Sequence, residues 1–190
     1  MSADPAWPLL ASLGCSASVI GNRETHILAI PFRAKLDGSR HPVLCANLRT
    51  AGGQVVLPGT WSTNVNGLRI TVVGVSVAMV TSRMKSAIIS AYLWDDPIET
   101  AVREAERLRE NADVLVALTH IGLPQDKRLA EQTDLYDLIC GGHSHDVLDS
   151  PLKVNQTWIV QGGSHGRFFG EYEYEFATQS LIGGLQPWLS

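Results

Sequence analysis

Four of the six histidines in this sequence come directly after apolar runs that are expected to be buried strands. They are His120, His143, His145 and His165. A histidine at the end of a strand is held by a rigid element and still reaches a shared cleft, which suits a metal ligand that needs fixed geometry. Imidazole binds Zn, Mn, Fe and similar ions, often together with carboxylate or amide oxygens. The pattern therefore predicts a divalent-metal site at the strand ends.

The competing interpretation is structural, because a single histidine at a strand end is usually hydrogen-bonded and not bound to a metal. Two features favour a metal role for His120 and His143. The Gly141-Gly142 pair lets the backbone turn sharply just before His143. In His143-Ser144-His145, alternate residues of an extended segment share one side. Both imidazoles are therefore expected to face one ion or two adjacent ions.

The elements that carry these residues alternate between strand and helix. DVLVALTH is expected to be a buried strand that ends at His120, and DLYDLIC is expected to open into a loop at Gly141. WIVQGGSH repeats this pattern before His165. Asp96 suits the N-cap of a helix that begins at Pro97, and a second helix is expected over 124–133. Alternating strands and helices predict the α/β class, in which ligands gather at strand ends.

Other patterns fill the rest of the chain, and the clearest of them is the strand over 68–77. They predict a helix over 6–13 ended by Gly14, a strand over 16–20, a helix over 30–36, a buried strand over 41–48, a hairpin turn at 64–67, a strand over 68–77 and a final strand near 169–176. Residues 178–190 are expected to be a poorly fixed tail. The expected organisation is one domain over residues 1–177 followed by this tail.

The composition is that of a globular protein. The chain has 190 residues, of which 45% are hydrophobic, and a net charge of -4 with acids and bases mixed. It has no basic cluster, which argues against nucleic-acid binding, and no apolar run long enough to cross a membrane. Three widely spaced cysteines are expected to be free thiols, which indicates a reducing, cytoplasmic location. The N-terminus does not resemble a signal peptide.

Two motifs together resemble the calcineurin-like metallophosphoesterases, in particular the bacterial 5'-nucleotidase and cyclic-nucleotide phosphodiesterase branch. They are Leu118-Thr119-His120-Ile121-Gly122 and Gly141-Gly142-His143-Ser144-His145. Gly21-Asn22-Arg23-Glu24 stands where that family has Gly-Asn-His-Glu, and Pro42 to Asn47 matches the strand that follows. The resemblance covers about residues 8–176. It implies a four-layer α-β-β-α sandwich that lacks its first strands.

The resemblance also implies a ligand set. Asn22, His120 and His143 would bind one metal and His145 the other, with Mn, Zn, Fe or Mg as one or two ions. The family's Asp-x-His and its bridging Gly-Asp should lie upstream of residue 8, and the only acid there, Asp4, has a different context. The sequence thus predicts three ligands for one ion and one ligand for the other.

Three more residues are expected near the substrate. Arg23 replaces the family's histidine, so it can hold a phosphate with a bidentate fork but cannot readily give up a proton. The alternative is that Arg23 pairs with Glu24 or another acid. His26 is a candidate to replace the lost histidine or else an exposed loop residue, and His165 is a candidate to face substrate or else structural. Asn22 is also counted as substrate-binding, whereas His41 is expected to be a surface residue.

The resulting expectation is a metal-dependent phosphoester hydrolase, similar to 5'-nucleotidases and acting on a small phosphoester such as a nucleotide. The absent ligands would impair it. The alternatives are a non-catalytic phosphate- or metal-binding remnant of the fold and a purely structural domain. Loss of the first strands would also expose a sheet edge, and exposed edges invite pairing with another chain. A homodimer through that edge is therefore expected.

Overall fold

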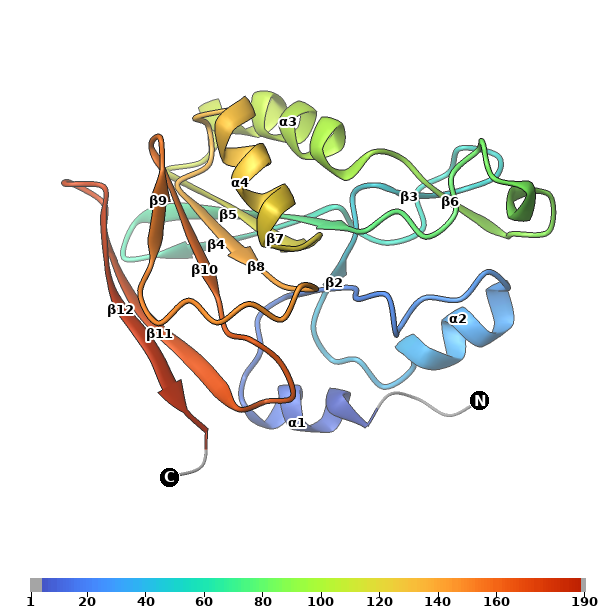
Figure 1. Cartoon of the computed structure of the whole chain (residues 1–190), viewed down its shortest axis with the longest axis horizontal. Helices are drawn as coiled ribbons and strands as arrows, with labels where there is room; N and C mark the ends of the chain where they lie inside the picture. Colours follow the sequence, from blue (N-terminus) through green and yellow to red (C-terminus); the bar gives the residue numbers. More distant parts are fainter. Residues whose placement is uncertain (1–4, 189–190) are drawn as a thin grey trace.

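A computed structural model describes residues 5–188, so Asp4 lies outside the described part of the chain. Its centre is a six-stranded sheet in the order β4-β5-β7-β8-β10-β9 (Figure 1). These strands are β4 (Thr60–Val65), β5 (Leu68–Ser76), β7 (Val114–His120), β8 (Leu138–Gly141), β9 (Leu152–Val154) and β10 (Thr157–Gln161). The four inner strands are parallel, and β4 and β9 pair antiparallel at the edges. The predicted α/β class is confirmed.

The expected hairpin turn joins β4 to β5. Asn66 and Gly67 both have positive φ, 52° and 85°, as a tight hairpin turn of this kind requires. Beyond the turn, β5 becomes buried along its length, with Val73 and Val75 fully enclosed. A strand covered on both faces reads as a nearly continuous apolar run, which is why its sequence predicted it so clearly.

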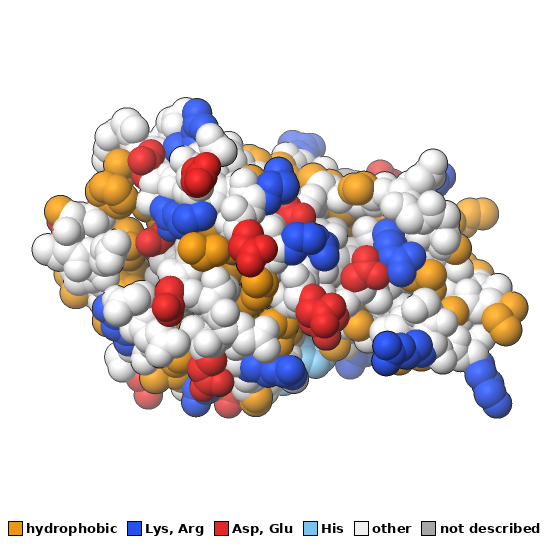
Figure 2. Space-filling view, turned by 90° about the horizontal axis from the view of Figure 1, so that it is seen from above, with side chains coloured by type: hydrophobic (Ala, Val, Ile, Leu, Met, Phe, Trp, Pro, Cys, Tyr) orange, Lys and Arg blue, Asp and Glu red, His pale blue; other side chains and the backbone are white. Residues whose placement is uncertain are grey.

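Helices α3 (Pro97–Leu108) and α4 (Leu123–Gln132) cover one face of the sheet (Figure 1). Asp96 caps α3 as predicted, because its Oδ1 accepts hydrogen bonds from the backbone N–H groups of Ile98 and Glu99. Ala101 and Ala105, on the inner side of α3, are completely buried. Figure 2 shows acidic and basic side chains interspersed over this outer face, so no large patch of one sign forms there.

Shorter elements pack on the other face. They are α1 (Ala6–Ser12), β1 (Ser18–Val19), α2 (Ala29–Leu36), β2 (Val43–Leu44), β3 (Leu48–Thr50), η1 (Lys85–Ile88) and β6 (Tyr92–Trp94). The strands form two small sheets, β1-β2 and β3-β6. β1 and β2 contact β5, and α1 and α2 lie beyond them (Figure 1), which gives the expected order of layers. None of the helices in the described segment is long and apolar enough to cross a bilayer.

The single strand expected over 41–48 is wrong, because the structure has two short strands there. The chain leaves β1 after Leu44, because the Cys45 N–H bonds to the Pro58 carbonyl and the Ala46 N–H to the Gly74 carbonyl. The run therefore divides into β2 and β3, which pair with different partners. A continuous apolar run reports burial but not which sheet a residue joins. The strand expected over 16–20 is likewise shorter, because its pairing with β2 is confined to two residues.

The final strand predicted near 169–176 exists as β11 (Phe168–Glu175), but it is not the last. β12 (Ser180–Pro187) follows and pairs antiparallel with all of β11. The boundary expected between residues 177 and 178 therefore falls in the turn of a hairpin, and most of the expected tail is a strand. The two glycines at 183 and 184 obscured this strand, because glycine is rare in strand interiors.

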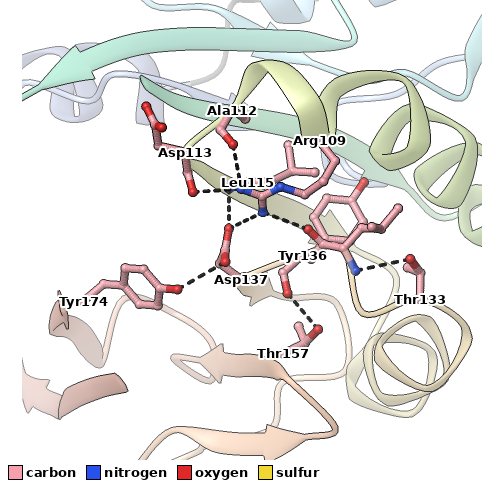
Figure 3. A network of polar contacts seen from close by, with 10 residues as sticks. Arg109, Ala112, Asp113, Leu115, Thr133, Tyr136, Asp137, Thr157 and Tyr174 are labelled. Atoms are coloured by element: carbon pink, nitrogen blue, oxygen red, sulfur yellow. Dashed lines mark hydrogen bonds and ion pairs between the residues drawn. The ribbon is translucent and has the colours of Figure 1, made fainter. Parts of the chain in front are cut away.

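A half-buried polar network joins the amino ends of the inner strands (Figure 3). The Arg109 guanidinium, in the short turn η2 (Arg109–Asn111), contacts Asp137 Oδ2 at 2.7 Å. It also donates to the carbonyls of Ala112, Asp113 and Leu135. Asp137 in turn accepts from the Leu115 N–H and from the Tyr174 hydroxyl of β11. This network fixes the end of the sheet that lies away from the histidines.

Candidate functional site

The site forms at the carboxyl ends of the parallel strands, where the predicted histidines leave the sheet. His120 is the last residue of β7, and its Nε2 lies 3.0 Å from Oδ1 of Asn22. Asn22 comes from the loop after β1, 98 residues earlier in the sequence. The layered fold therefore brings together two residues that only the family resemblance had connected.

The other strand-exit histidines stand in two ring pairs. The rings of His120 and His143 meet edge to face with centroids 5.0 Å apart. Those of His145 and His165 meet in the same way at 5.8 Å. His145 also lowers the pKa of His120 by charge repulsion, so the two pairs act on each other. The structure thus gathers Asn22 and all four predicted histidines at one edge of the sheet.

The expectation that His143-Ser144-His145 is extended is wrong. His143 and His145 have φ of 84° and 63°, in the left-handed region, and His165 has φ of 61°. This region is uncommon for residues other than glycine and costs on the order of 1–3 kcal/mol each. The kinked backbone sends His143 toward His120 and His145 toward His165. Strain of this kind persists where the surroundings enforce it, and it clusters at functional sites.

His120 is kept neutral by its surroundings. Burial lowers the pKa of His120 to about 4, and repulsion from His143 and His145 adds to the effect. A metal ligand must offer an unprotonated ring nitrogen. At neutral pH His120 therefore has a free lone pair and carries no charge that would repel a cation.

The donor atoms present fit one divalent ion. In octahedral coordination, two adjacent donors that each lie about 2.1 Å from the ion are about 3.0 Å apart. This matches the separation of Asn22 Oδ1 and His120 Nε2, with the His143 ring beside them. Within residues 5–188, however, no group of three or more His, Cys, Asp or Glu side chains has the arrangement of a preformed metal site.

Glu24 is a site residue that the sequence interpretation considered only as a partner of Arg23. A Cβ placed on Gly21 would lie 2.5 Å from Glu24 Oε2 and 3.3 Å from Cε1 of the His120 ring. The Glu24 carboxylate and the His120 ring therefore approach the same point, and Gly21 leaves room for both. Among the described residues Glu24 forms no ion pair with Arg23. The Glu24 carboxylate, two residues after Asn22, therefore faces the site.

Arg23 and His26 are next to the site in sequence, but no contact described for residues 5–188 joins their side chains to the histidines. Arg23 is exposed, and its carbonyl accepts a hydrogen bond from the Lys35 ammonium. Nδ1 of His26 accepts from the Leu28 N–H at 2.9 Å, which ties this ring to the backbone before α2. His165 Nδ1 is 2.8 Å from the Ser164 hydroxyl.

His41 is not the surface residue that the sequence suggested. Its Nε2 lies 2.9 Å from the Ser18 hydroxyl, and its ring meets Trp7 at 5.8 Å. It is half-buried and helps to hold α1 against β1. The proline after it had suggested an exposed strand start.

A group of buried polar residues beneath the histidine loops was missed altogether. Asp126 on α4 is fully buried, and Thr119 and Gln161 at the strand ends are 2% exposed each. One signal was available in the sequence. Asp126 lies three and four residues before Leu129 and Ala130, so it occupies the buried face of its helix. An acid at such a position is rarely there without a partner.

The fold described above is that of the calcineurin-like metallophosphoesterases, because solved 5'-nucleotidases and phosphoesterases share it. The chain superposes on the solved structure of the calcineurin-like phosphoesterase YfkN from Bacillus subtilis with a TM-score of 0.77. At 19% identity, that match covers 98% of this chain and 67% of the solved YfkN chain. No family model matches the sequence.

The curated relatives point to the same group. The apyrase of Tabanus yao is 31% identical over 90% of this chain and 35% of its own length. The 5'-nucleotidase of Vibrio cholerae is 26% identical over 94% of this chain and 38% of its own length. The chain's relatives and structural neighbours thus include 5'-nucleotidases, apyrases and calcineurin-like phosphoesterases. The chain spans between a third and two fifths of the length of the two relatives named here.

Proposed function

We propose that this domain takes part in metal-dependent hydrolysis of a small phosphoester, in the manner its relatives' names suggest. The observation that carries the proposal is the approach of Asn22 Oδ1 to His120 Nε2 at 3.0 Å, with the His143 ring at its side. An amide oxygen and two imidazoles form a donor set suited to a divalent transition metal. The fold and the relatives named 5'-nucleotidase and apyrase support a phosphoester substrate, a nucleotide among them.

Each residue then has a distinct role. Asn22, His120 and His143 would hold one ion, and His145 would contribute to a second. When bound, such ions polarise the phosphoryl oxygens and lower the pKa of a coordinated water. Mn, Zn, Fe and Mg are the candidate ions, and one or two would be bound.

Three side chains are assigned to the substrate. Arg23 is exposed one residue from Asn22 and would hold phosphate oxygens, because guanidinium binds phosphate in a bidentate fork. His165 would face the substrate beside His145. His26 would supply the proton-transfer group that Arg23 does not offer. Its bond to the Leu28 N–H leaves Nε2 as the nitrogen for that task.

The second candidate is a phosphate- or metal-binding module without turnover. It is favoured by one observation, that the described residues hold no preformed group of three His, Cys, Asp or Glu ligands. Binding of one ion by Asn22, His120 and His143 would satisfy this function. Turnover would require a second ion and the ligands that hold it.

Metal content separates the two candidates. The protein is purified without chelators, and bound Mn and Zn are counted per chain by elemental analysis. Two equivalents together with hydrolysis of an aryl phosphodiester in Mn²⁺ would support the enzyme. One equivalent without hydrolysis would support the binding module. His143→Ala should remove the metal while His41→Gln, a histidine on the α1 side, should keep it; retention by His143→Ala would overturn both.

Three further proposals concern the setting of this domain. A cytoplasmic location is supported by the free thiols of Cys15, Cys45 and Cys140. The interspersed charges in Figure 2 agree with a small-molecule partner in place of nucleic acid. A homodimer through a sheet edge is supported by the small β1-β2 sheet, whose strands pair only with each other among the described residues. Light scattering tests the dimer, and a monodisperse monomer would exclude it.

A further inference from the structure

A buried row of polar residues crosses the sheet directly beneath the histidine loops. Gly141 of β8 pairs with Gln161 of β10, and Thr119 of β7 lies one residue beyond the last paired residues of β7 and β8. Asp126 reaches this row from α4, and its Oδ1 accepts a hydrogen bond of 2.6 Å from the Thr119 hydroxyl. Thr119 immediately precedes His120. The row therefore adjoins the proposed metal site at its first histidine.

The row also reaches the other histidines through Ser144, which stands between His143 and His145. Its hydroxyl oxygen accepts from the Leu123 N–H at 3.0 Å and from Gln161 Nε2 at 3.1 Å. Its single hydrogen is donated to Asp146. A serine hydroxyl has one hydrogen and two acceptor sites. All three are used, so Ser144 has nothing left to donate.

This accounting fixes the orientation of the Gln161 amide. If the amide were reversed, its oxygen would face Ser144, whose only hydrogen is already given to Asp146. Nε2 must therefore face Ser144, and Oε1 must face the opposite way. There it approaches Asp126, because a Cβ placed on Gly141 would lie 3.3 Å from Gln161 Oε1 and 2.2 Å from Asp126 Oδ2.

Two buried acceptors thus converge over Gly141. In the described part of the chain neither Asp126 Oδ2 nor Gln161 Oε1 has a hydrogen-bond partner. A glutamine oxygen has no hydrogen to give, whereas the Asp126 carboxyl can carry one and stands over the same glycine. Leaving both unpaired would cost the full desolvation of each group.

We infer that Asp126 is a neutral carboxylic acid that donates its proton to Gln161 Oε1, and that this bond makes Asp126 the positioning residue for the histidine loops. The chain of contacts then runs without a gap from Thr119 through Asp126 and Gln161 to Ser144. One end holds the backbone beside His120, and the other holds the segment between His143 and His145. The positioning role rests on the proposed function, whereas the protonation does not.

The electrostatic surroundings agree. Burial raises the pKa of Asp126 to about 7, and the hydrogen bond from Thr119 offsets part of that rise. The titratable group that interacts with Asp126 from the adjoining strand is the Cys140 thiol, whose pKa rises to about 12 through burial and the neighbouring Asp126. Tyr172 of β11 lies beyond it and is coupled to Cys140.

The test of protonation uses metal-free protein and infrared spectroscopy. At pH 6 the wild type should show the carbonyl stretch of a buried carboxylic acid, which Asp126→Asn should lack. Asp134→Asn, an exposed aspartate just after the same helix, should keep it. An identical spectrum for the wild type and Asp126→Asn would overturn the inference, whatever the domain proves to bind.

The test of positioning compares two variants by Mn²⁺ titration. Asp126→Asn keeps a donor toward Gln161 and should bind Mn²⁺ as the wild type does. Asp126→Leu removes the donor and should weaken binding about tenfold, the usual loss for a residue that orients ligands. If Asp126→Leu does not fold, Gln161→Met takes its place, because it removes the acceptor of the same hydrogen bond. Equal losses in Asp126→Asn and Asp126→Leu would refute the role.

Failure of the proposed function is distinguishable from failure of this inference. If the wild type binds no Mn²⁺, the metal proposal fails, and the loop is then followed by the ring nitrogen resonances of the histidines. Those of His143 and His145 should shift in Asp126→Leu and return in Asp126→Asn. Unchanged resonances in Asp126→Leu would show that Asp126 does not position the loop.

Discussion

Two polar networks lie at opposite ends of the same parallel strands, and their buried groups are satisfied in different ways. At the amino ends, Arg109 donates to Asp137 and to three carbonyls, and Asp137 accepts from Leu115 and Tyr174 (Figure 3). Both charges are matched there. At the carboxyl ends, two buried oxygens of Asp126 and Gln161 have no N–H or O–H donor of another described residue, and only a proton on Asp126 satisfies both.

The difference separates stabilisation from function. A fully satisfied network fixes one conformation and needs no further ligand. Sites in α/β folds form at the carboxyl ends of the strands, and departures from local rules concentrate at such sites. The end of the sheet that depends on the proton of Asp126 is also the end with three histidines of positive φ. The molecule is conventional at one end of its strands and strained at the other.

The largest effect on stability should come from breaking the satisfied network. Arg109→Ala leaves Asp137, which is 13% exposed, as an unpaired and mostly buried charge. Loss of one partner of such a pair costs about 3 kcal/mol. Urea denaturation should show this loss, while Mn²⁺ affinity of the folded fraction stays unchanged. A weakened affinity would mean that the two ends of the sheet are coupled and would erase the contrast.

Crowding the network of Asp126 and Gln161 should reduce the stability of the fold somewhat less. Gly141→Ala places a Cβ 2.2 Å from Asp126 Oδ2, whereas Gly142→Ala places one no closer than 3.4 Å to any neighbour. Overpacking of a core costs about 1–3 kcal/mol, so Gly141→Ala should be destabilised and Gly142→Ala should not. In the double variant Gly141→Ala with Asp126→Ala, the two losses should be less than additive. Strict additivity would show that the two groups do not meet.

The buried acid at the carboxyl ends of the strands should make stability fall as pH rises. Folded Asp126 has a pKa of about 7 and the unfolded chain one near 3.8, so between these values only the folded state holds the proton. Relative to Asp126→Asn, the metal-free wild type should lose roughly 1 kcal/mol between pH 5 and pH 6. His120 acts in the opposite sense, but it is present in both proteins and cancels. Parallel stability curves would contradict the buried acid.

The smallest effect should come from the rim of the satisfied network. Tyr174→Phe removes one hydrogen bond of 3.2 Å to Asp137 Oδ1, while Arg109 still neutralises that carboxylate. A loss of about 1 kcal/mol is expected, the usual net value of one hydrogen bond. Thermal unfolding is the measurement, with Tyr172→Phe on the same strand for comparison. A loss as large as that of Arg109→Ala would show that Asp137 depends on the Tyr174 hydroxyl as much as on the Arg109 guanidinium.

Local signals predicted the elements that local chemistry determines. The Asp96 cap, the Asn66-Gly67 turn and the β7 strand each follow from a few adjacent residues, and all are confirmed. The strand-end pattern also identified four histidines that do meet at one edge. Asn22 was placed by the family motif alone, because its partner His120 is 98 residues away.

Features set by distant contacts were not predictable. The division of residues 41–48 between two sheets depends on carbonyls of Pro58 and Gly74. The kinked backbone of His143 and His145 depends on Ser144, which is held by α4 and β10. β12 is stabilised by its pairing with β11 despite two glycines. In each case tertiary contacts outweigh the intrinsic preference of the segment.

The left-handed backbone at His143, His145 and His165 also sets what a change of side chain at these positions would do. Glycine adopts that conformation without steric cost. Replacement of any of the three by glycine would therefore relieve local strain and at the same time remove an imidazole from the site. At these positions the demand for local stability and the demand for the imidazole oppose each other.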